Sequence, residues 1–192
     1  MDHGCCYRAK DLIVSLSKFF KISLSGGDSL IPLGKELELI RNYINIQRIA
    51  RGKSIRLKIK IPQSIFAMPI IKLSIQPVVE NAILHGFSGF RDDGTIAIES
   101  DFLDPETIRI TIEDNGIGIP EKELADIQET LETYPLENAI RHFGLYNVNR
   151  RIKNMYGNEY GIRIGSEIGN YTQVIMTLPA AKLTQKETSE DV

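Results

Sequence analysis

The sequence predicts an α+β sandwich in which a mixed sheet carries helices on one face. Two amphipathic helical segments come first, segments with a period of two follow, and these strand-like segments are clustered with helices between them. A doubly wound fold would need stricter alternation of strands and helices. The 192 residues, 42% hydrophobic and 25% charged, suffice for one main domain with an appendage and a core without disulfides.

The charge and cysteine content exclude several classes of protein. Lys and Arg number 23 and Asp and Glu 25, so the net charge of −2 provides no general field for holding a nucleic acid. Cys5 and Cys6 are adjacent and cannot join distant segments, so we interpret them as incidental thiols of a reducing compartment. No run reaches the roughly 18 apolar residues of a membrane span, and the first ten residues lack a signal-peptide core. We therefore expect a cytosolic piece of protein.

Two amphipathic helices are predicted before the first strand, over residues 10–24 and 33–51. Gly52 follows the second helix as a plausible C-terminal cap. Such stripes are typical of core or helix-pairing surfaces. The apolar stripes consist of Leu12, Ile13, Leu16, Phe19 and Phe20 in the first helix, and of Leu37, Ile40, Tyr43, Ile44 and Gln47 in the second.

Five later segments alternate apolar and polar residues, which is the pattern of a strand with one buried face. The predicted strands are residues 54–61, 95–102, 107–113, 160–166 and 172–179. A turn-prone connection makes the second and third of them antiparallel neighbours. Helices are predicted at residues 70–85, 121–131 and 145–156, the middle one within a long mobile loop over 119–143, and residues 182–192 as a disordered tail.

The segment 76–86 carries the first candidate functional residues. At about 100° per residue, Asn81 and His85 lie together on the flank of its apolar stripe, and Glu80 projects toward the polar side. An amide oxygen, an imidazole and a nearby carboxylate could hold a hydrated Mg²⁺. The alternative is an ordinary amphipathic helix in which these side chains make local hydrogen bonds. Pro77 interrupts the pattern, so the helix could instead begin near Ser74.

Residues 113–119 form the second candidate site, directly after an alternating strand. Asp114 can accept a hydrogen bond from an exocyclic amine such as that of adenine, and Gly116 and Gly118 allow a ring to approach the backbone closely. The alternative is a type I′ hairpin turn, which Asn-Gly favours. The next thirty or so residues do not resemble a partner strand, which makes a plain hairpin the weaker interpretation.

A third candidate site lies at Gly144, which opens an amphipathic helix. Free N–H groups and the positive end of the helix dipole bind phosphates at such a position. A glycine before a helix is common, and the segment matches neither the Walker pattern nor G-x-G-x-x-G, so this feature gains weight only together with the other two.

Taken together, these segments resemble the GHKL ATPases, whose nucleotide-binding fold is the Bergerat sandwich. Asn81 in its Glu-Asn-Ala context, residues 114–118 and residues 144–148 are similar in order and spacing to the N, G1 and G2 boxes of that superfamily. More narrowly, residues 15–17, 37–47, 76–86 and 150–152 resemble the LytS-like branch of sensor histidine kinases. The resemblance extends over about residues 10–179.

The resemblance implies a role for each box. Asn81 would ligate Mg²⁺, Asp114 would bind the adenine amine, and residues 119–143 would be the ATP lid. Glu80 would orient or deprotonate the acceptor, and with Asn81 and His85 it completes the catalytic candidates. The expected ATP-binding residues are Asn81, His85, Asp114, Gly116, Gly118, Ile119, Phe143, Gly144, Leu145 and Thr172, of which Gly144 and Leu145 would present backbone N–H groups to phosphates.

The sequence departs from the family pattern at three places. Leu84 stands where relatives commonly have a phosphate-binding lysine, and His142 stands where the G2 box often has a glycine. The phosphoacceptor histidine of a Pro-His-Phe-like motif is absent, and His3 does not match its context.

We therefore expect the catalytic ATP-binding portion of a two-component sensor histidine kinase. Residues 1–52 would be the end of the dimerisation and phosphoacceptor helices, residues 53–180 the ATP-binding domain and residues 181–192 the tail. Its partners would be ATP, Mg²⁺, a response regulator and a second copy of a membrane-anchored bacterial parent, without nucleic acid. The alternatives are a degenerate nucleotide-binding module and a GHKL ATPase or serine kinase of another branch.

Overall fold

The computed structural model describes residues 3–24, 29–52, 54–87, 93–133 and 143–180, and a five-stranded sheet forms its centre. The sheet has the order β2-β4-β5-β7-β6. Its strands are β2 (Ser54–Lys60), β4 (Asp93–Asp104), β5 (Thr107–Asp114), β7 (Tyr171–Pro179) and β6 (Gly161–Glu167). β2 runs parallel to β4, and all other neighbouring strands are antiparallel. The predicted mixed, mostly antiparallel sheet is confirmed.

Alternation along the strands gives the sheet one buried face and one open face. The open face carries charged side chains such as Lys60, whose Nζ lies 2.7 Å from Oε1 of Glu99. Because only the other face is apolar, the helices have one side on which to pack. The isoleucines of the two central strands that are at most 2% exposed on that side are Ile96, Ile98, Ile108, Ile110 and Ile112.

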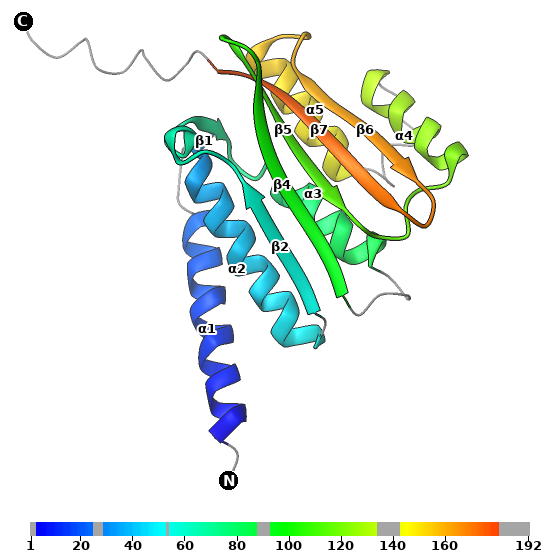
Figure 1. The fold of residues 1–192 in the computed structure, drawn as a ribbon. Helices are drawn as coiled ribbons and strands as arrows, with labels where there is room; N and C mark the ends of the chain where they lie inside the picture. Colours follow the sequence, from blue (N-terminus) through cyan, green and yellow to red (C-terminus); the bar gives the residue numbers. More distant parts are fainter. Residues whose placement is uncertain (1–2, 25–28, 53, 88–92, 134–142, 181–192) are drawn as a thin grey trace, which may run out of the picture.

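The helices of the sandwich are α3 (Gln76–Asn81), which continues into the single π-helical turn η2 (Ala82–Gly86), then α4 (Glu121–Glu132) and α5 (Phe143–Tyr156). In the view of Figure 1, α3 and α5 lie behind the sheet and α4 lies next to the edge strand β6. The N-terminal helices α1 (His3–Ser23) and α2 (Leu33–Arg51) pack against each other, and α2 lies along the edge strand β2 (Figure 1). This arrangement confirms the two-layer α+β sandwich preceded by two amphipathic helices.

The helix predicted over residues 70–85 is wrong in its first half. Residues Pro69–Ile71 form strand β3, which pairs with β1 (Leu30–Pro32) in a separate antiparallel sheet, and a 3₁₀ turn η1 (Gln63–Ile65) precedes it. α3 begins only at Gln76 because Pro77 lacks an N–H group and is tolerated in the first turn of a helix. β1 was not predicted, since three residues are too short to display a period.

Elsewhere the predicted elements are confirmed within a few residues at their ends. Gly52 caps α2 in the left-handed conformation with φ of 65°, as the sequence suggested, and its N–H donates to the carbonyl of Arg48 at 3.0 Å. α1 begins several residues earlier than predicted, at His3. The predicted disordered tail at 182–192 and the turn at 25–28 lie outside the described residues. No helix of the described ranges is both long enough and apolar enough to cross a membrane.

We predict that Asn149→Ala destabilises the domain by about 2–3 kcal/mol, because it removes the acceptor of the Ile162 N–H and leaves the carbonyl of Leu131 to the long 3.5 Å bond from Nζ of Lys153. Asn149 on α5 is 2% exposed, donates to the carbonyl of Leu131 at 2.7 Å and accepts from the N–H of Ile162 at 2.8 Å. Urea unfolding gives the free energy. Asn154→Ala, an exposed change on the same helix, is the control and should have an effect below about 0.5 kcal/mol. Equal values for the two variants would contradict this role of Asn149.

Candidate nucleotide-binding site

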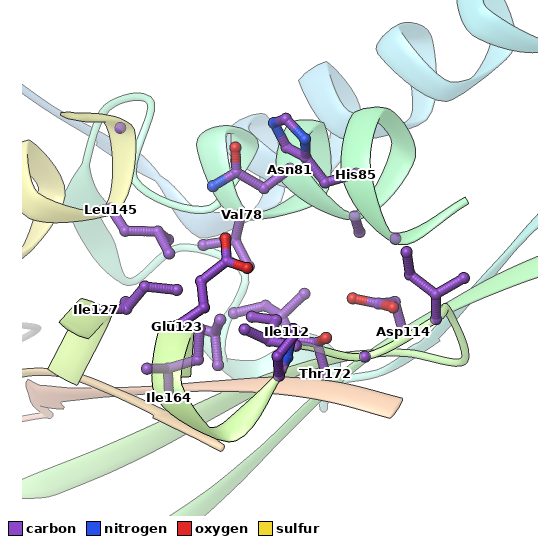
Figure 2. A pocket seen from close by; sticks show the side chains of 18 residues that line it. Val78, Asn81, His85, Ile112, Asp114, Glu123, Ile127, Leu145, Ile164 and Thr172 are labelled. Carbon is purple, nitrogen blue, oxygen red and sulfur yellow. The ribbon is translucent and has the colours of Figure 1, made fainter. Parts of the chain in front are cut away.

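A cavity of about 540 Å³ lies between the helices and the apolar face of the sheet. Figure 2 shows Asn81 and His85 on one side of it, Asp114 at one end and Leu145 at the other. The lining comes from α3, η2, α4, α5 and the ends of β5 and β7, so residues far apart in the sequence meet at one place. The fold therefore brings segments of all three candidate sites to one cavity.

Asp114 is the last residue of β5 and is only 6% exposed. Its Oδ1 accepts a hydrogen bond from the N–H of Gly116 at 2.8 Å. The pKa of Asp114 is raised from 3.8 to about 6, mainly by burial and to a smaller extent by the nearby charge of Glu113, while the bond from Gly116 opposes the rise. A buried carboxylate with unused acceptor capacity is suited to an amine donor of a ligand.

The glycines after Asp114 are required by close contacts. A Cβ on Gly116 would lie 2.5 Å from both Oδ1 of Asp114 and the carbonyl oxygen of Gly86. Gly118 has φ of 70° and packs against the backbone of Glu167, where a side chain would collide with the carbonyl. Gly116 itself is not part of the cavity wall, whereas Gly118 is. Gly116 acts through Asp114, whose carboxylate it holds in place by the hydrogen bond from its N–H.

The loop after β5 is not a hairpin, so this alternative for residues 113–119 is wrong. β5 pairs with β4 and β7, and the next strand in the sequence, β6, begins only at Gly161. The loop crosses from the sheet to the helices instead. The N–H of Ile117 donates to the carbonyl of Gly86 at 3.0 Å, and the N–H of Ile119 donates to Oγ of Ser166 at 2.9 Å. These bonds fix the wall of the cavity next to Asp114.

Asn81 and His85 both line the cavity, one turn apart as predicted (Figure 2). Asn81 ends α3 and His85 lies in the π-helical turn, where the N–H of Phe87 donates to the carbonyl of Ala82 at 3.0 Å. Glu80 is half-buried and does not line the cavity. Leu84, 36% exposed, does not line it either, so the residue in the family's lysine position points elsewhere.

The remaining predicted residues are distributed around the rim and floor. Gly144 and Leu145 at the start of α5, Ile119 in the loop and Thr172 on β7 all line the cavity. Phe143 is the first residue of α5, but its side chain lies outside the described part, as does His142.

Sequence reasoning missed one charged residue of the cavity. Glu123 on α4 extends its carboxylate into the cavity, with Ile127 one turn further along the helix (Figure 2). The helix itself was predicted, and its buried side is marked by Ile127 and Leu131 at 3% and 7% exposure. Glu123 lies four residues before Ile127, and residues four apart share one face of a helix. This spacing could have indicated that Glu123 lies on the same side as Ile127.

The donor set is compatible with Mg²⁺ but not with a metal held by protein alone. No group of three or more His, Cys, Asp or Glu that could hold a metal occurs among the residues described. Mg²⁺ takes few protein ligands and completes its octahedron with water and phosphate oxygens. One amide oxygen, that of Asn81, therefore fits an ion that arrives with a polyphosphate.

The family to which this architecture belongs follows from comparison with known proteins. The family model described as histidine kinase-, DNA gyrase B-, and HSP90-like ATPase matches residues 70–182, and the model described as histidine kinase matches residues 5–55. The first match covers more than half of the chain, so the chain belongs to this ATPase family. It is an ATP-binding catalytic domain of the histidine kinase type.

Its relatives include sensor kinases of several bacteria. The chain is 29% identical over 172 residues to sensor histidine kinase BtsS of Escherichia coli K12, which is 90% of this chain and 28% of that protein. It is 30% identical over 171 residues to sensor protein LytS of Oceanobacillus iheyensis, 88% of this chain and 29% of that one. The chain thus spans less than a third of the length of these relatives.

Solved structures share the fold. The histidine kinase domain of the blue-light activated histidine kinase from Erythrobacter litoralis EL346 has a TM-score of 0.53 at 22% identity, covering 90% of this chain and 74% of that one. The catalytic domain of histidine kinase ThkA has a TM-score of 0.53 at 15% identity, with 80% and 97% covered. These likenesses show that the five-stranded sandwich shares its fold with those two domains.

We predict that ionisation of Asp114 destabilises the ligand-free domain. Because the folded-state pKa is raised to about 6, the contribution of Asp114 to stability is full below its unfolded pKa of 3.8 and is lost as the pH rises through 6. Urea unfolding at pH 5 and pH 8 should therefore show the wild type losing about 1–2 kcal/mol more than Asp114→Asn, which has no such group to titrate. Identical pH profiles for the two proteins would refute the raised pKa.

Proposed function

We propose that this domain binds Mg²⁺-ATP and donates the γ-phosphoryl group to a histidine of its parent protein, for relay to a response regulator. The observation that carries the proposal is the buried carboxylate of Asp114 at one end of a cavity whose other end is the start of a helix. An amine-selective group and an anion-binding group at opposite ends match a nucleotide with its base and its phosphates.

At the base end, ionised Asp114 accepts a hydrogen bond from the exocyclic amine of adenine. Guanine presents a carbonyl oxygen at the corresponding position, which would face the carboxylate without a hydrogen between them. Thr172 lies on the adjacent strand β7, opposite Asp114 in the strand register, and lines the same end. The pocket therefore favours adenine.

At the phosphate end, α5 supplies backbone N–H groups of Gly144 and Leu145, and its 14 residues give it a substantial dipole. Asn81 is the residue that would hold Mg²⁺, through its amide oxygen. When bound, the ion neutralises charge on the phosphate oxygens and on the departing diphosphate. Glu123 extends from α4 as a second charged wall of this cavity.

In the transfer step, a nitrogen of the acceptor imidazole forms a bond to the γ-phosphorus while the bond from that phosphorus to the bridging oxygen breaks. ADP leaves with the bonding electrons, and the second imidazole nitrogen loses a proton. Glu80, half-buried beside Asn81 and outside the cavity wall, is the carboxylate that we assign to orient the acceptor or take that proton.

The helical lead-in supports association of two parent chains. α1 exposes several large apolar side chains although one side of it packs on α2, which favours a homodimer at this helix. We place the domain in the cytoplasm, in a membrane-anchored bacterial sensor that passes its phosphoryl group to a response regulator. The exposed apolar residues are Ile13, Val14 and Phe20 of α1 and Leu24 directly after it, at 66%, 43%, 52% and 75%.

A second candidate is a degenerate module that binds nucleotide without transferring phosphate. Leu84 in place of a lysine is the observation in its favour, because an apolar and 36% exposed residue offers no charge to a phosphate. The two candidates share the pocket and differ only in the reaction.

We predict that the domain prefers ATP to GTP by at least about tenfold, since one hydrogen bond to a buried charged acceptor is at stake. Asp114→Asn should weaken ATP binding by a similar factor and reduce the preference. Glu106→Gln, an exposed change in the turn before the same strand, is the control and should change neither affinity. Calorimetric titration of each protein with each nucleotide measures both effects. Equal affinities for ATP and GTP would remove the assigned adenine site.

We predict that γ-labelled ATP does not label this chain on histidine, because the sequence holds no acceptor motif around His3. The same reaction should label a separately supplied acceptor helix pair from the parent kinase. The label is assayed by its stability to base and lability to acid, which distinguishes phosphohistidine from phosphoserine.

Two results would contradict this scheme. Phosphohistidine on His3 would make the N-terminal segment itself the acceptor. Nucleotide binding without transfer to the supplied acceptor would favour the degenerate module, and Leu84→Lys would then be the variant that tests restoration of transfer.

A further inference from the structure

A buried carboxylate of α2 accepts hydrogen bonds from the backbone just before α3. Glu36 is completely buried in the first turn of that helix. Its Oε2 accepts from the N–H of Leu73 at 3.0 Å, and its Oε1 accepts from the N–H groups of Ile75 at 3.1 Å and Gln76 at 3.2 Å. One side chain thus satisfies three backbone donors at the point where α3 begins.

The same segment is also bonded to α5. Nη2 of Arg151, two turns along α5 from Gly144, donates to the carbonyl of Lys72 at 2.7 Å. Leu73 adopts φ of 57°, a left-handed conformation that a leucine keeps only when its surroundings enforce it. We call residues 72–76 the junction, since α2, α3 and α5 all meet there.

A charged residue at position 36 is expensive for the fold. Burial raises the pKa of Glu36, and the backbone hydrogen bonds from the junction oppose that rise. An apolar side chain in the same place would avoid the desolvation of a carboxylate. What only the carboxylate provides is a fixed hydrogen-bonded geometry for the junction.

Because α3 is short, the position of its first turn determines the position of its last residue. It has six residues, and Asn81 is its last, five positions after Gln76, whose N–H bonds to Glu36. A helix this short moves as a unit with its first turn, so a shift of the junction carries Asn81 with it. His85 follows within the next turn.

We infer that Glu36 is a positioning residue for nucleotide binding, which holds Asn81 at its place in the cavity and couples α2 to the nucleotide site. The inference rests on the proposed function, because Asn81 matters only if Mg²⁺-ATP occupies the cavity. Since coupling free energies are reciprocal, a change in α2 alters the affinity for Mg²⁺-ATP, and bound nucleotide restrains α2.

The test uses Glu36→Gln, which keeps the shape of the side chain. The amide oxygen can still accept hydrogen bonds from the N–H groups of Ile75 and Gln76. The amide nitrogen then faces the N–H of Leu73, and because both groups are donors, no hydrogen bond forms between them. We expect ATP affinity to fall about tenfold in Mg²⁺ and by less than about twofold in EDTA, because the lost contact is that of Asn81 with the metal-bound phosphates. Titrations are run on protein shown to be folded by circular dichroism.

A double-mutant cycle separates positioning from general loosening. Asn81→Ala alone should reproduce the Mg²⁺-specific loss, and adding Glu36→Gln to it should weaken binding by less than about twofold, since both changes remove the same interaction. Additive losses would overturn the inference and leave Glu36 with a purely structural role. Glu38→Gln is the matched control, two positions further along α2 with a partly exposed carboxylate that pairs with Lys35, and it should leave the affinity unchanged.

Two further outcomes are decided by the same measurements. If Glu36→Gln does not fold, Arg151→Ala replaces it, because that side chain is exposed and its bond to Lys72 also restrains the junction. A Mg²⁺-specific loss in Arg151→Ala supports the inference, and an unchanged affinity overturns it. Absence of Mg²⁺-dependent ATP binding in the wild type would refute the proposed function itself, whereas wild-type binding that Glu36→Gln retains refutes only this inference.

Discussion

A buried carboxylate joins the helical lead-in of this molecule to the start of α3. The lead-in and the rest of the chain are also linked by apolar packing, by the pairing of β1 with β3 and by the bond from Nε of Arg48 to the carbonyl of Ile55. Glu36 adds a directional link, because its three hydrogen bonds specify where the backbone of the junction lies relative to α2. The placement of α3, and with it one wall of the cavity, follows from that link.

The opposite wall depends on the absence of side chains. Gly116 and Gly86 approach so closely that the loop after β5 can bond directly to the π-helical turn, through the N–H of Ile117 and the carbonyl of Gly86. This contact encloses Asp114, and burial raises the pKa of its carboxyl group to about 6. The bonded loop therefore fixes the end of the cavity where a nucleobase would be selected. The other end is bounded by α5, which follows residues outside the described structure.

The sequence predicts the parts of this protein that rest on local periodicity. The five main strands and α2 have buried faces whose spacing is visible within one segment, and the glycines near Asp114 mark close backbone contacts. The role of Glu36 was not predictable in this way. Its partners lie 37 to 40 residues away, and an acidic residue in the first turn of a helix is normally an exposed, dipole-favourable choice. β1 and β3 were missed because only their mutual pairing makes them strands.

The parallel pairing of β2 with β4 has a topological consequence. Two parallel neighbours cannot be joined by a tight turn, so the chain between them has to cross one face of the sheet, and α3 lies in that crossing. The cavity thus owes its helical wall to one parallel pair in an otherwise antiparallel sheet. Local opening of this crossover removes the helical wall of the cavity even when the sheet stays folded.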